Sequence, residues 1–339
     1  MLYVTTRNRT DSYTAHRAFR EGFAADGGQF APIRLPSFTK EQLADFRNMS
    51  FCESVAYVLN IFYSAHLTAW DVEFAIGKRP MKIKSIARKM TVAEFWHNPD
   101  QSMAYSIDRI YKLLFGNDSM VGKPRGWASI AIRIAFVFGT YCELCREGIE
   151  LCDISVCGED FESVIATWYA RKMGLPVNNI ICGTNENCSV WDLLHKGQMD
   201  TGAAVVKTDA PRMDQTVPCG IERLIYETLG LDESLRYLQK VYAKGVYRVP
   251  AELHTKLSDG LISSVVGQNR IKDLIASAYN THGYFIDPYM AISYGALQDY
   301  RAKGRENRLT LLISEESPAK YGKFIAGITS VAQKDICNR

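Results

Sequence analysis

One segment in the middle of the chain limits the fold more than any other, because it alternates strand, helix and strand. Residues 149–156 alternate like a strand, and residues 160–173 read as a helix that a glycine and a proline end. A second short strand follows at 179–183. Strands joined through a helix run parallel, and parallel sheets are covered by helices. The segment therefore predicts an α/β fold, and the β-rich run 309–314 is expected to join the same sheet.

The N-terminal part is expected to be mainly helical. A strand-like start at residues 3–6 is followed by a helix from Ser12 onward. Residues 39–66 place apolar side chains at helical spacing, with Thr39 as the N-cap and Gln42 at the third helical position. This pattern predicts a helical region in front of the sheet.

Composition and charge exclude several classes of protein. The 339 residues include 40 basic and 37 acidic side chains, a net charge of +3 that is too small and too evenly spread to favour nucleic acid or an anionic membrane. We expect no apolar run long enough to cross a membrane, and no export signal at the first residues. The nine cysteines, an odd number at irregular spacing, predict reduced thiols in a cytoplasmic protein.

Several short segments, in the same order along the chain, resemble segments of the threonine synthase family. The members of that family are pyridoxal-phosphate (PLP) enzymes of fold type II. These segments are residues 3–7, 24–32, 170–176, 184–187, 213–214, 221–224, 287–291 and 317–321. The resemblance implies a shortened, tryptophan synthase β-like α/β core with a parallel sheet at 93–330. It also implies a mainly helical threonine-synthase-like N-terminal domain at 1–92 and a C-terminal tail at 331–339. Such enzymes convert O-phosphohomoserine to threonine and phosphate, and a lysine carries the cofactor.

The lysine that this family uses is missing. The family reads E-L-F-H-G-P-T-L-A-F-K-D where this chain has residues 94–105, and the Glu, His and Pro of that motif match in place. The lysine position is then Ala104, whose methyl group cannot form an imine. Lys112, the nearest lysine downstream, lies eight residues along an expected helix, roughly 12 Å away. We therefore expect no catalytic lysine here.

Most of the family's small cofactor lobe is also expected to be missing. Only 22 residues, 105–126, separate Ala104 from the next family-like segment at 127–133. In the family this interval holds most of that lobe, including a glycine-rich loop at the cofactor. Residues 122–126 resemble a loop that closes the gap.

The loop that would hold the cofactor phosphate is acidic. The family reads V-P-[ST]-G-N-F-G-[DN], whereas here Glu159, Asp160, Phe161 and Glu162 occupy its centre. A helix N-terminus favours an anion by about 0.3–2 kcal/mol, but a carboxylate about 5 Å away opposes a unit negative charge by about 3 kcal/mol. We interpret the acids as capping and neutralising the helix start. Glu315 stands where the family places Thr or Ser against the pyridine nitrogen.

Two other groups of residues suggest sites. His97, Asn185 and Asn187 are retained from the family motifs and are candidates for a remnant pocket. Four cysteines have the spacing C-x2-C-x6-C-x4-C, but cysteine at such positions is more often a small buried hydrophobe than a zinc ligand, and we expect no metal. They are Cys142, Cys145, Cys152 and Cys157.

These departures favour a catalytically inactive homologue with a binding, regulatory or scaffold role, and no cofactor is expected. A homo-oligomer, an active-enzyme partner or a small amino-acid-like ligand would suit such a role. The alternative is an active PLP lyase of threonine synthase type that acts on O-phosphohomoserine or a related amino acid, supported by the retained family residues.

Overall fold

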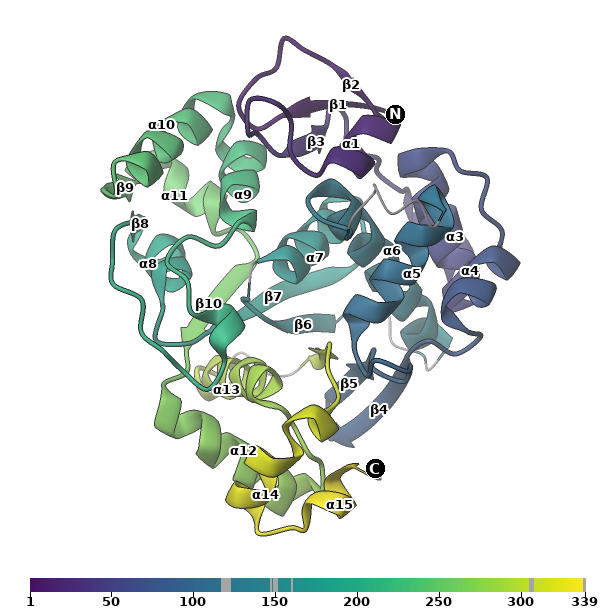
Figure 1. The fold of residues 1–339 in the computed structure, drawn as a ribbon, viewed down its shortest axis with the longest axis vertical. Helices are drawn as coiled ribbons and strands as arrows, with labels where there is room; N and C mark the ends of the chain where they lie inside the picture. Colours follow the sequence, from purple (N-terminus) through teal and green to yellow (C-terminus); the bar gives the residue numbers. More distant parts are fainter. Residues whose placement is uncertain (117–122, 147, 149–151, 160, 305–307, 338–339) are drawn as a thin grey trace.

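A six-stranded sheet runs through the centre of the computed structural model, which describes the chain except residues 117–122, 147, 149–151, 160, 305–307 and 338–339 (Figure 1). The order is β10-β7-β6-β11-β5-β4, in which every neighbouring pair is parallel except β4 with β5. The strands are β4 (Lys82–Ala87), β5 (Met90–Glu94), β6 (Cys152–Cys157), β7 (Val177–Thr184), β10 (Leu261–Val265) and β11 (Leu309–Ser314).

The predicted strand–helix–strand unit is confirmed, with α7 (Glu162–Lys172) between β6 and β7. The expected strand began at residue 149, but β6 begins at Cys152 and residues 149–151 lie outside the described residues. The run 309–314 also joins the sheet as predicted, because β11 pairs in parallel with both β6 and β5. The α/β fold with a mostly parallel central sheet is thus established.

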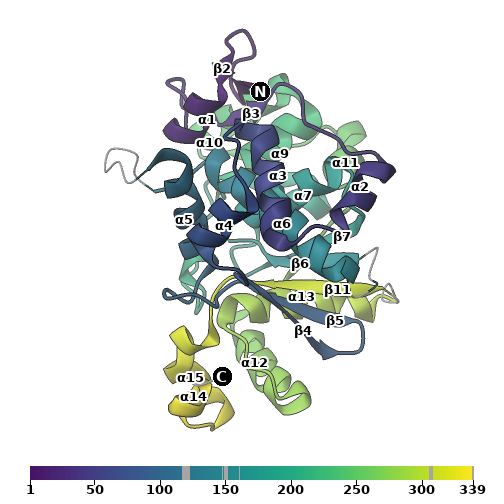
Figure 2. The ribbon, with the colours of Figure 1, turned by 90° about the vertical axis from the view of Figure 1, so that its right-hand side faces the viewer.

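Helices cover both faces of the sheet, as Figure 2 shows from the side. Helix α7 and the long α6 (Trp127–Arg146) lie on one face, and α12 (Gln268–His282) and α13 (Pro288–Ala302) lie on the other. Side chains alternate along β11, so that Leu311 enters the core on the α7 side and Leu312 enters the core on the α13 side. This alternation explains why an almost wholly apolar strand is stable only between two layers of helices.

The N-terminal part combines a small sheet with helices. Three antiparallel strands, β1 (Leu2–Thr5), β2 (Tyr13–Thr14) and β3 (Phe30–Pro32), lie beside α1 (Ala15–Glu21). The predicted helix over 39–66 is two helices, α2 (Lys40–Phe46) and α3 (Phe51–Tyr63), because Ser50 begins a second capping box. The predicted boundary at residue 92 falls inside β5, since β4 and β5 belong to the central sheet.

The remaining elements complete the two sides of the molecule. They are α4 (Ala69–Ile76), α5 (Met103–Phe115), α8 (Ser189–Lys196), β8 (Gln198–Asp200), η1 (Pro211–Met213), α9 (Gly220–Leu229), α10 (Leu231–Tyr242), β9 (Val246–Arg248), α11 (Ala251–Leu257), η2 (Pro318–Tyr321), α14 (Gly322–Thr329) and α15 (Gln333–Cys337). Strands β8 and β9 form a separate antiparallel pair.

Helix α6 corrects one expectation from composition. Its 20 residues are long and apolar enough to cross a membrane by length and composition, although we expected no such run. The most apolar window of α6 is 78% buried inside the protein, where α6 packs between α3 and α7. A core helix in contact with protein on several sides is apolar on most of its surface, so burial accounts for this composition.

The capping box of α3 should contribute measurably to stability. The Ser50 hydroxyl accepts a hydrogen bond from the Glu53 amide at 3.1 Å, and the Glu53 carboxylate accepts one from the Ser50 amide at 2.6 Å. We expect Ser50→Ala to lower the free energy of unfolding by about 1 kcal/mol, as measured by urea denaturation. Ser50→Thr keeps the hydroxyl and serves as the control. An alanine variant as stable as the threonine variant would contradict this assignment.

Candidate functional site

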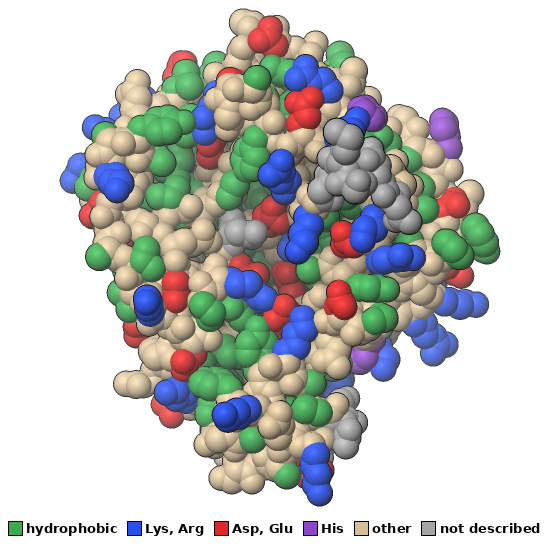
Figure 3. Space-filling model, viewed as in Figure 1, with side chains coloured by type: hydrophobic (Ala, Val, Ile, Leu, Met, Phe, Trp, Pro, Cys, Tyr) green, Lys and Arg blue, Asp and Glu red, His purple; other side chains and the backbone are tan. Residues whose placement is uncertain are grey.

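The residues at the positions of the family's phosphate loop, which we expect not to hold a cofactor, lie where β6 ends and α7 begins. Gly158 lies against β7, with its amide donating to the Gly183 carbonyl at 2.8 Å. A Cβ at Gly158 would stand 2.9 Å from that carbonyl oxygen, so a side chain does not fit there. Phe161 precedes α7 in the left-handed region, with φ 71°. Figure 3 shows this region as a hollow ringed by basic and acidic side chains.

Arg133 of α6 joins two of the predicted acidic residues. Its guanidinium lies 2.8 Å from a Glu315 oxygen and 3.4 Å from a Glu162 oxygen, and it donates to the Ser163 hydroxyl at 2.7 Å. Glu162 also accepts from Ser129 at 2.5 Å, and Glu315 accepts from Ser163. Burial acts to raise the pKa of Glu315, but the Arg133 charge and the Ser163 hydrogen bond outweigh it and lower that pKa.

Arg212 of η1 makes a second cluster beside the first. It ion-pairs with Glu159, lies 2.7 Å from a Glu316 oxygen, and stacks its guanidinium 4.0 Å from the centre of the Tyr289 ring. Burial opposes its charge, but Glu159 and Glu316 raise the pKa of Arg212. The space left among these side chains and Asp287 is about 20 Å³, which is about enough for one water molecule.

The acids do not cap α7 in the way we predicted. Phe161 is the N-cap residue, and it makes no side-chain cap hydrogen bond. Glu159 and Glu162 bond instead to arginines from η1 and α6, although Glu162 does lie in the first turn, where its charge suits the helix dipole. Sequence proximity suggested a local cap, whereas the fold brings distant cations to these carboxylates. Asp160 lies outside the described residues.

Ala104 lines a separate, open cavity of about 470 Å³. It is the second residue of α5, which begins after Ser102 as N-cap. Lys112 lines the same cavity and is held 2.7 Å from Asp108. The lining carries charges of both signs: Asp100, Asp108 and Glu162 against Lys112, Lys123 and Arg133. The part of the predicted closing loop at residue 122 lies outside the described residues.

The three residues predicted to form a remnant pocket divide into two networks. His97 lies 2.7 Å from Glu94, whose other oxygen accepts from Tyr284 at 2.7 Å, and it lines a cavity of about 230 Å³. Asn185 and Asn187 both donate to Asp214, at 2.9 and 3.2 Å. The asparagines thus anchor the segment around Asp214, and none of the cavities described includes them together with His97.

The four cysteines considered for zinc lie on two elements, α6 and β6. Burial raises the pKa of Cys142 and Cys152 to about 12, so both remain protonated thiols at neutral pH. Within the described ranges, no group of three or more His, Cys, Asp or Glu side chains could hold a metal ion. All nine cysteines are free thiols.

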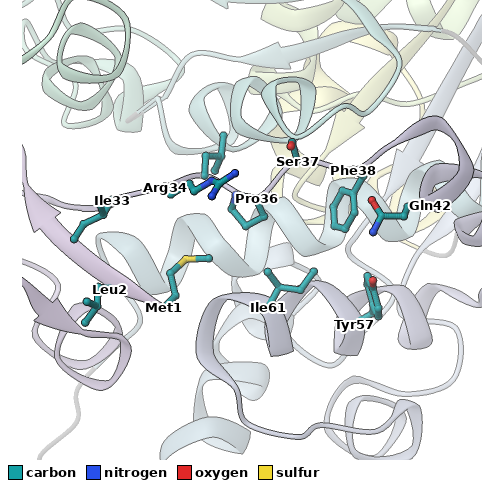
Figure 4. Close-up of a pocket in the computed structure, with 11 residues that line it drawn as sticks. Met1, Leu2, Ile33, Arg34, Pro36, Ser37, Phe38, Gln42, Tyr57 and Ile61 are labelled. Carbon is teal, nitrogen blue, oxygen red and sulfur yellow. The ribbon is translucent and has the colours of Figure 1, made fainter.

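The largest cavity described, about 730 Å³, lies away from these residues. Figure 4 shows it between α3, which contributes Tyr57 and Ile61, and the N-terminal strand with Met1 and Leu2. Its lining is mainly apolar and carries one charged side chain, Arg34. Nothing in this lining resembles a catalytic group.

Sequence reasoning missed the arginines and the Glu94–Tyr284 contact. Arg133 and Glu315 are 182 residues apart, and Glu94 and Tyr284 are 190 residues apart. The excess of carboxylates at 159–162 was a signal that cations had to lie nearby, because unpaired buried charges are costly. It did not indicate which cations these were.

Comparison with known proteins finds similarity to threonine synthases and threonine-synthase-like proteins. Residues 2–78 match the family described as "Threonine synthase N terminus". Threonine synthase-like 1 of Pongo abelii is 24% identical over 209 residues, covering 60% of this chain and 27% of that protein. Threonine synthase of Saccharomyces cerevisiae is 24% identical over 240 residues, covering 64% and 47%. The matches thus span about half or less of the length of these relatives.

Solved structures show the same fold. Threonine synthase from Brucella melitensis, solved with PLP bound, superposes with a TM-score of 0.87 at 19% identity, over 100% of this chain and 95% of that one. The yeast enzyme gives a TM-score of 0.86 at 17% identity, over 97% and 90%. The chain therefore has the fold of the threonine synthases, the fold type II architecture of PLP-dependent enzymes, and its residues 2–78 match their N-terminal family.

Proposed function

We propose that this chain is a catalytically inactive threonine-synthase-like protein that binds a small ligand without PLP chemistry. The observation that carries the proposal is the pair of arginine–carboxylate clusters at the start of α7. Arg133 and Arg212 face four carboxylates, Glu159, Glu162, Glu315 and Glu316, and Lys320 also pairs with Glu316, so both arginines are already committed to carboxylates of the protein.

These residues do not fit the PLP phosphate. The phosphate carries nearly two negative charges, and each carboxylate about 5 Å away would repel a unit charge by about 3 kcal/mol at an effective dielectric constant near 20. The favourable helix terminus contributes only about 0.3–2 kcal/mol. The arginines that could compensate are already engaged, and the remaining space of about 20 Å³ is far too small for the cofactor. No step through PLP follows from these residues.

The open cavity beside Ala104 supports a binding role. Its volume of about 470 Å³ lies within the range of small-molecule sites, roughly 300–1,000 Å³. Charges of both signs line it, which suits a small zwitterionic, amino-acid-like ligand. A homo-oligomer or an active-enzyme partner belongs to the same proposal. The free cysteines support a reducing, cytoplasmic location.

The test is to add PLP to the full chain and measure visible absorbance, borohydride trapping and phosphate release from O-phosphohomoserine. We expect no visible band that borohydride bleaches with labelling of one lysine, and no phosphate release above a heat-denatured sample. Yeast threonine synthase is the positive control. Stoichiometric trapping on a single lysine, or phosphate release, would establish the active-lyase alternative instead.

Two variants make the test sharper. Ala104→Lys restores an amine at the family position, yet we expect it to remain inactive because the carboxylates around Arg133 and Arg212 are unchanged. Lys112→Gln removes one of the two lysines that line the cavity beside Ala104, the second being Lys123. Any trapping in the natural protein that Lys112→Gln abolishes would mean that this lysine serves as the carrier and that the proposal is wrong.

A further inference from the structure

A second cavity of about 230 Å³ lies at the carboxyl end of β5, beside the edge strand β4. In open α/β sheets, ligands bind outside the carboxyl ends of the strands. This cavity shares no described lining residue with the cavity beside Ala104. The lining residues that matter below are Lys82, Lys84, Glu94, Trp96, His97 and Tyr284.

Two lysines give this cavity its positive charge. Lys82 and Lys84 are two residues apart on β4, so their side chains leave the strand on the same face. Both are exposed, and the Lys84 ammonium lies 4.8 Å from the centre of the Tyr284 ring. Among the described residues, no carboxylate is within ion-pair distance of either lysine. Figure 3 shows other basic side chains gathered nearby, over the segment between α4 and β4.

The acid that lines the cavity is already engaged. Glu94 is 4% exposed, and its two oxygens are occupied by the Tyr284 hydroxyl and the His97 ring, each at 2.7 Å. The Glu94 carboxylate therefore holds Tyr284 and His97 in place and does not pair with the lysines. With one carboxylate against two ammonium groups, the cavity favours an anion.

The walls of the cavity are aromatic and held in position. The Trp96 indole N–H donates to the Ser314 hydroxyl at 3.0 Å, and its ring centre lies 4.2 Å from that of His97. Phe285 stacks on Tyr279 with ring centres 4.6 Å apart. Such surfaces bind the face or edge of a planar ring. The volume is below that of typical drug-sized sites, which limits the ligand to about one ring.

We propose that this cavity binds a small aromatic anion of one ring, with its acidic group on Lys82 and Lys84 and its ring against Trp96 and Tyr284. The inference does not depend on the proposed function, because the two cavities share no described lining residue. Failure of the PLP experiment and failure of the experiment below are therefore distinguishable.

The experiment measures binding of phenyl phosphate to the full chain by calorimetry and by ligand-observed NMR. Inorganic phosphate and benzyl alcohol separate the contributions of the charge and the ring. We expect saturable binding of phenyl phosphate, at least about tenfold tighter than either control compound. The double variant Lys82→Gln/Lys84→Gln should weaken it at least about tenfold, since hydrogen bonds to charged groups are involved.

Matched controls identify the site. The double variant Lys40→Gln/Lys256→Gln removes the same charge from exposed positions on α2 and α11, outside the cavity lining, and it should leave binding unchanged. Trp96→Phe removes the indole and should weaken binding less than the lysine variant does. Three results would each overturn the proposal. Benzyl alcohol could bind as tightly as phenyl phosphate, or the two lysine double variants could lose the same affinity for phenyl phosphate. Phenyl phosphate could also show no saturable binding up to millimolar concentrations.

Discussion

Replacing Arg133 with methionine is expected to lower the free energy of unfolding by about 2–3 kcal/mol. The substitution removes the cation that faces Glu315 and Glu162 and leaves two partly buried carboxylates close together. Breaking a buried ion pair costs roughly 3–5 kcal/mol, and the partial exposure of Arg133, 12% of its side chain, reduces that figure. Urea denaturation at pH 7 measures the change.

An ion pair exposed on the surface provides the control for this prediction. Arg17 pairs with Glu21 on the surface of α1, so Arg17→Met should cost less than about 0.5 kcal/mol. Adding Glu315→Gln to Arg133→Met should recover part of the loss, because the unpaired charge is removed. If Arg133→Met were as stable as Arg17→Met, the cluster would not hold α6 and α7 together.

The same cluster has a defined pH dependence. The pKa of Glu315 is lowered in the folded protein, so this carboxylate stabilises the fold above its ordinary pKa, and the contribution is lost as pH falls through the lowered value. Without the Arg133 charge, which opposes the effect of burial, burial should raise the pKa of Glu315. The stability deficit of Arg133→Met should therefore shrink as pH is lowered from about 7 to about 5.

Replacing Asp287 with asparagine is expected to stabilise the protein at pH 7.5 by about 1–3 kcal/mol. Asp287 is 2% exposed and caps α13 through the amides of Tyr289 and Met290. Burial raises its pKa to about 6, so the folded protein holds this proton more tightly than the unfolded chain. Its contribution to stability is consequently lost as pH rises between about 4 and 6. Asparagine keeps a capping oxygen without the buried charge.

Unfolding measured across this pH range tests the prediction. Asp287→Asn and the natural protein should be about equally stable near pH 4 and should separate as pH rises. Asp71→Asn is the matched control of opposite sign, because hydrogen bonds from Thr68 lower the pKa of that exposed carboxyl. Asp71→Asn should destabilise slightly at pH 7.5. A loss of stability in Asp287→Asn at pH 7.5 would show that the ionised cap outweighs the burial cost.

Several elements could be predicted from sequence because their signals are local. The capping box at Thr39 and Gln42, the β6–α7–β7 unit and the strand at 309–314 were all predicted correctly. Each depends on residues within a few positions of one another. The break between α2 and α3 was missed because the apolar periodicity continues through Ser50, whose capping geometry outweighed it.

The site shows the limit of such reasoning. Acidic residues at 159 and 162 and an alanine at 104 are properties of the sequence, and they alone argue against the ancestral cofactor. The ion-pair partners of these residues are set by the position of β11, which lies between β6 and β5 in the sheet. Strand β11 takes this place although it comes about 150 residues after β6 in the sequence. That position brings Glu315 to Ser163 and Arg133.

The sequence by itself therefore determined most of the secondary structure units and the family-like motifs, and it predicts that Ala104 and the acidic residues replace the family's lysine and glycines. Only the tertiary structure decided that the acids pair with Arg133 and Arg212, that His97 and the two asparagines lie in separate networks, and that two lysines of β4 face an aromatic cavity. The physical reason is that propensity and capping act over a few residues. Ion pairs and cavities are formed by groups that become neighbours only when the sheet assembles.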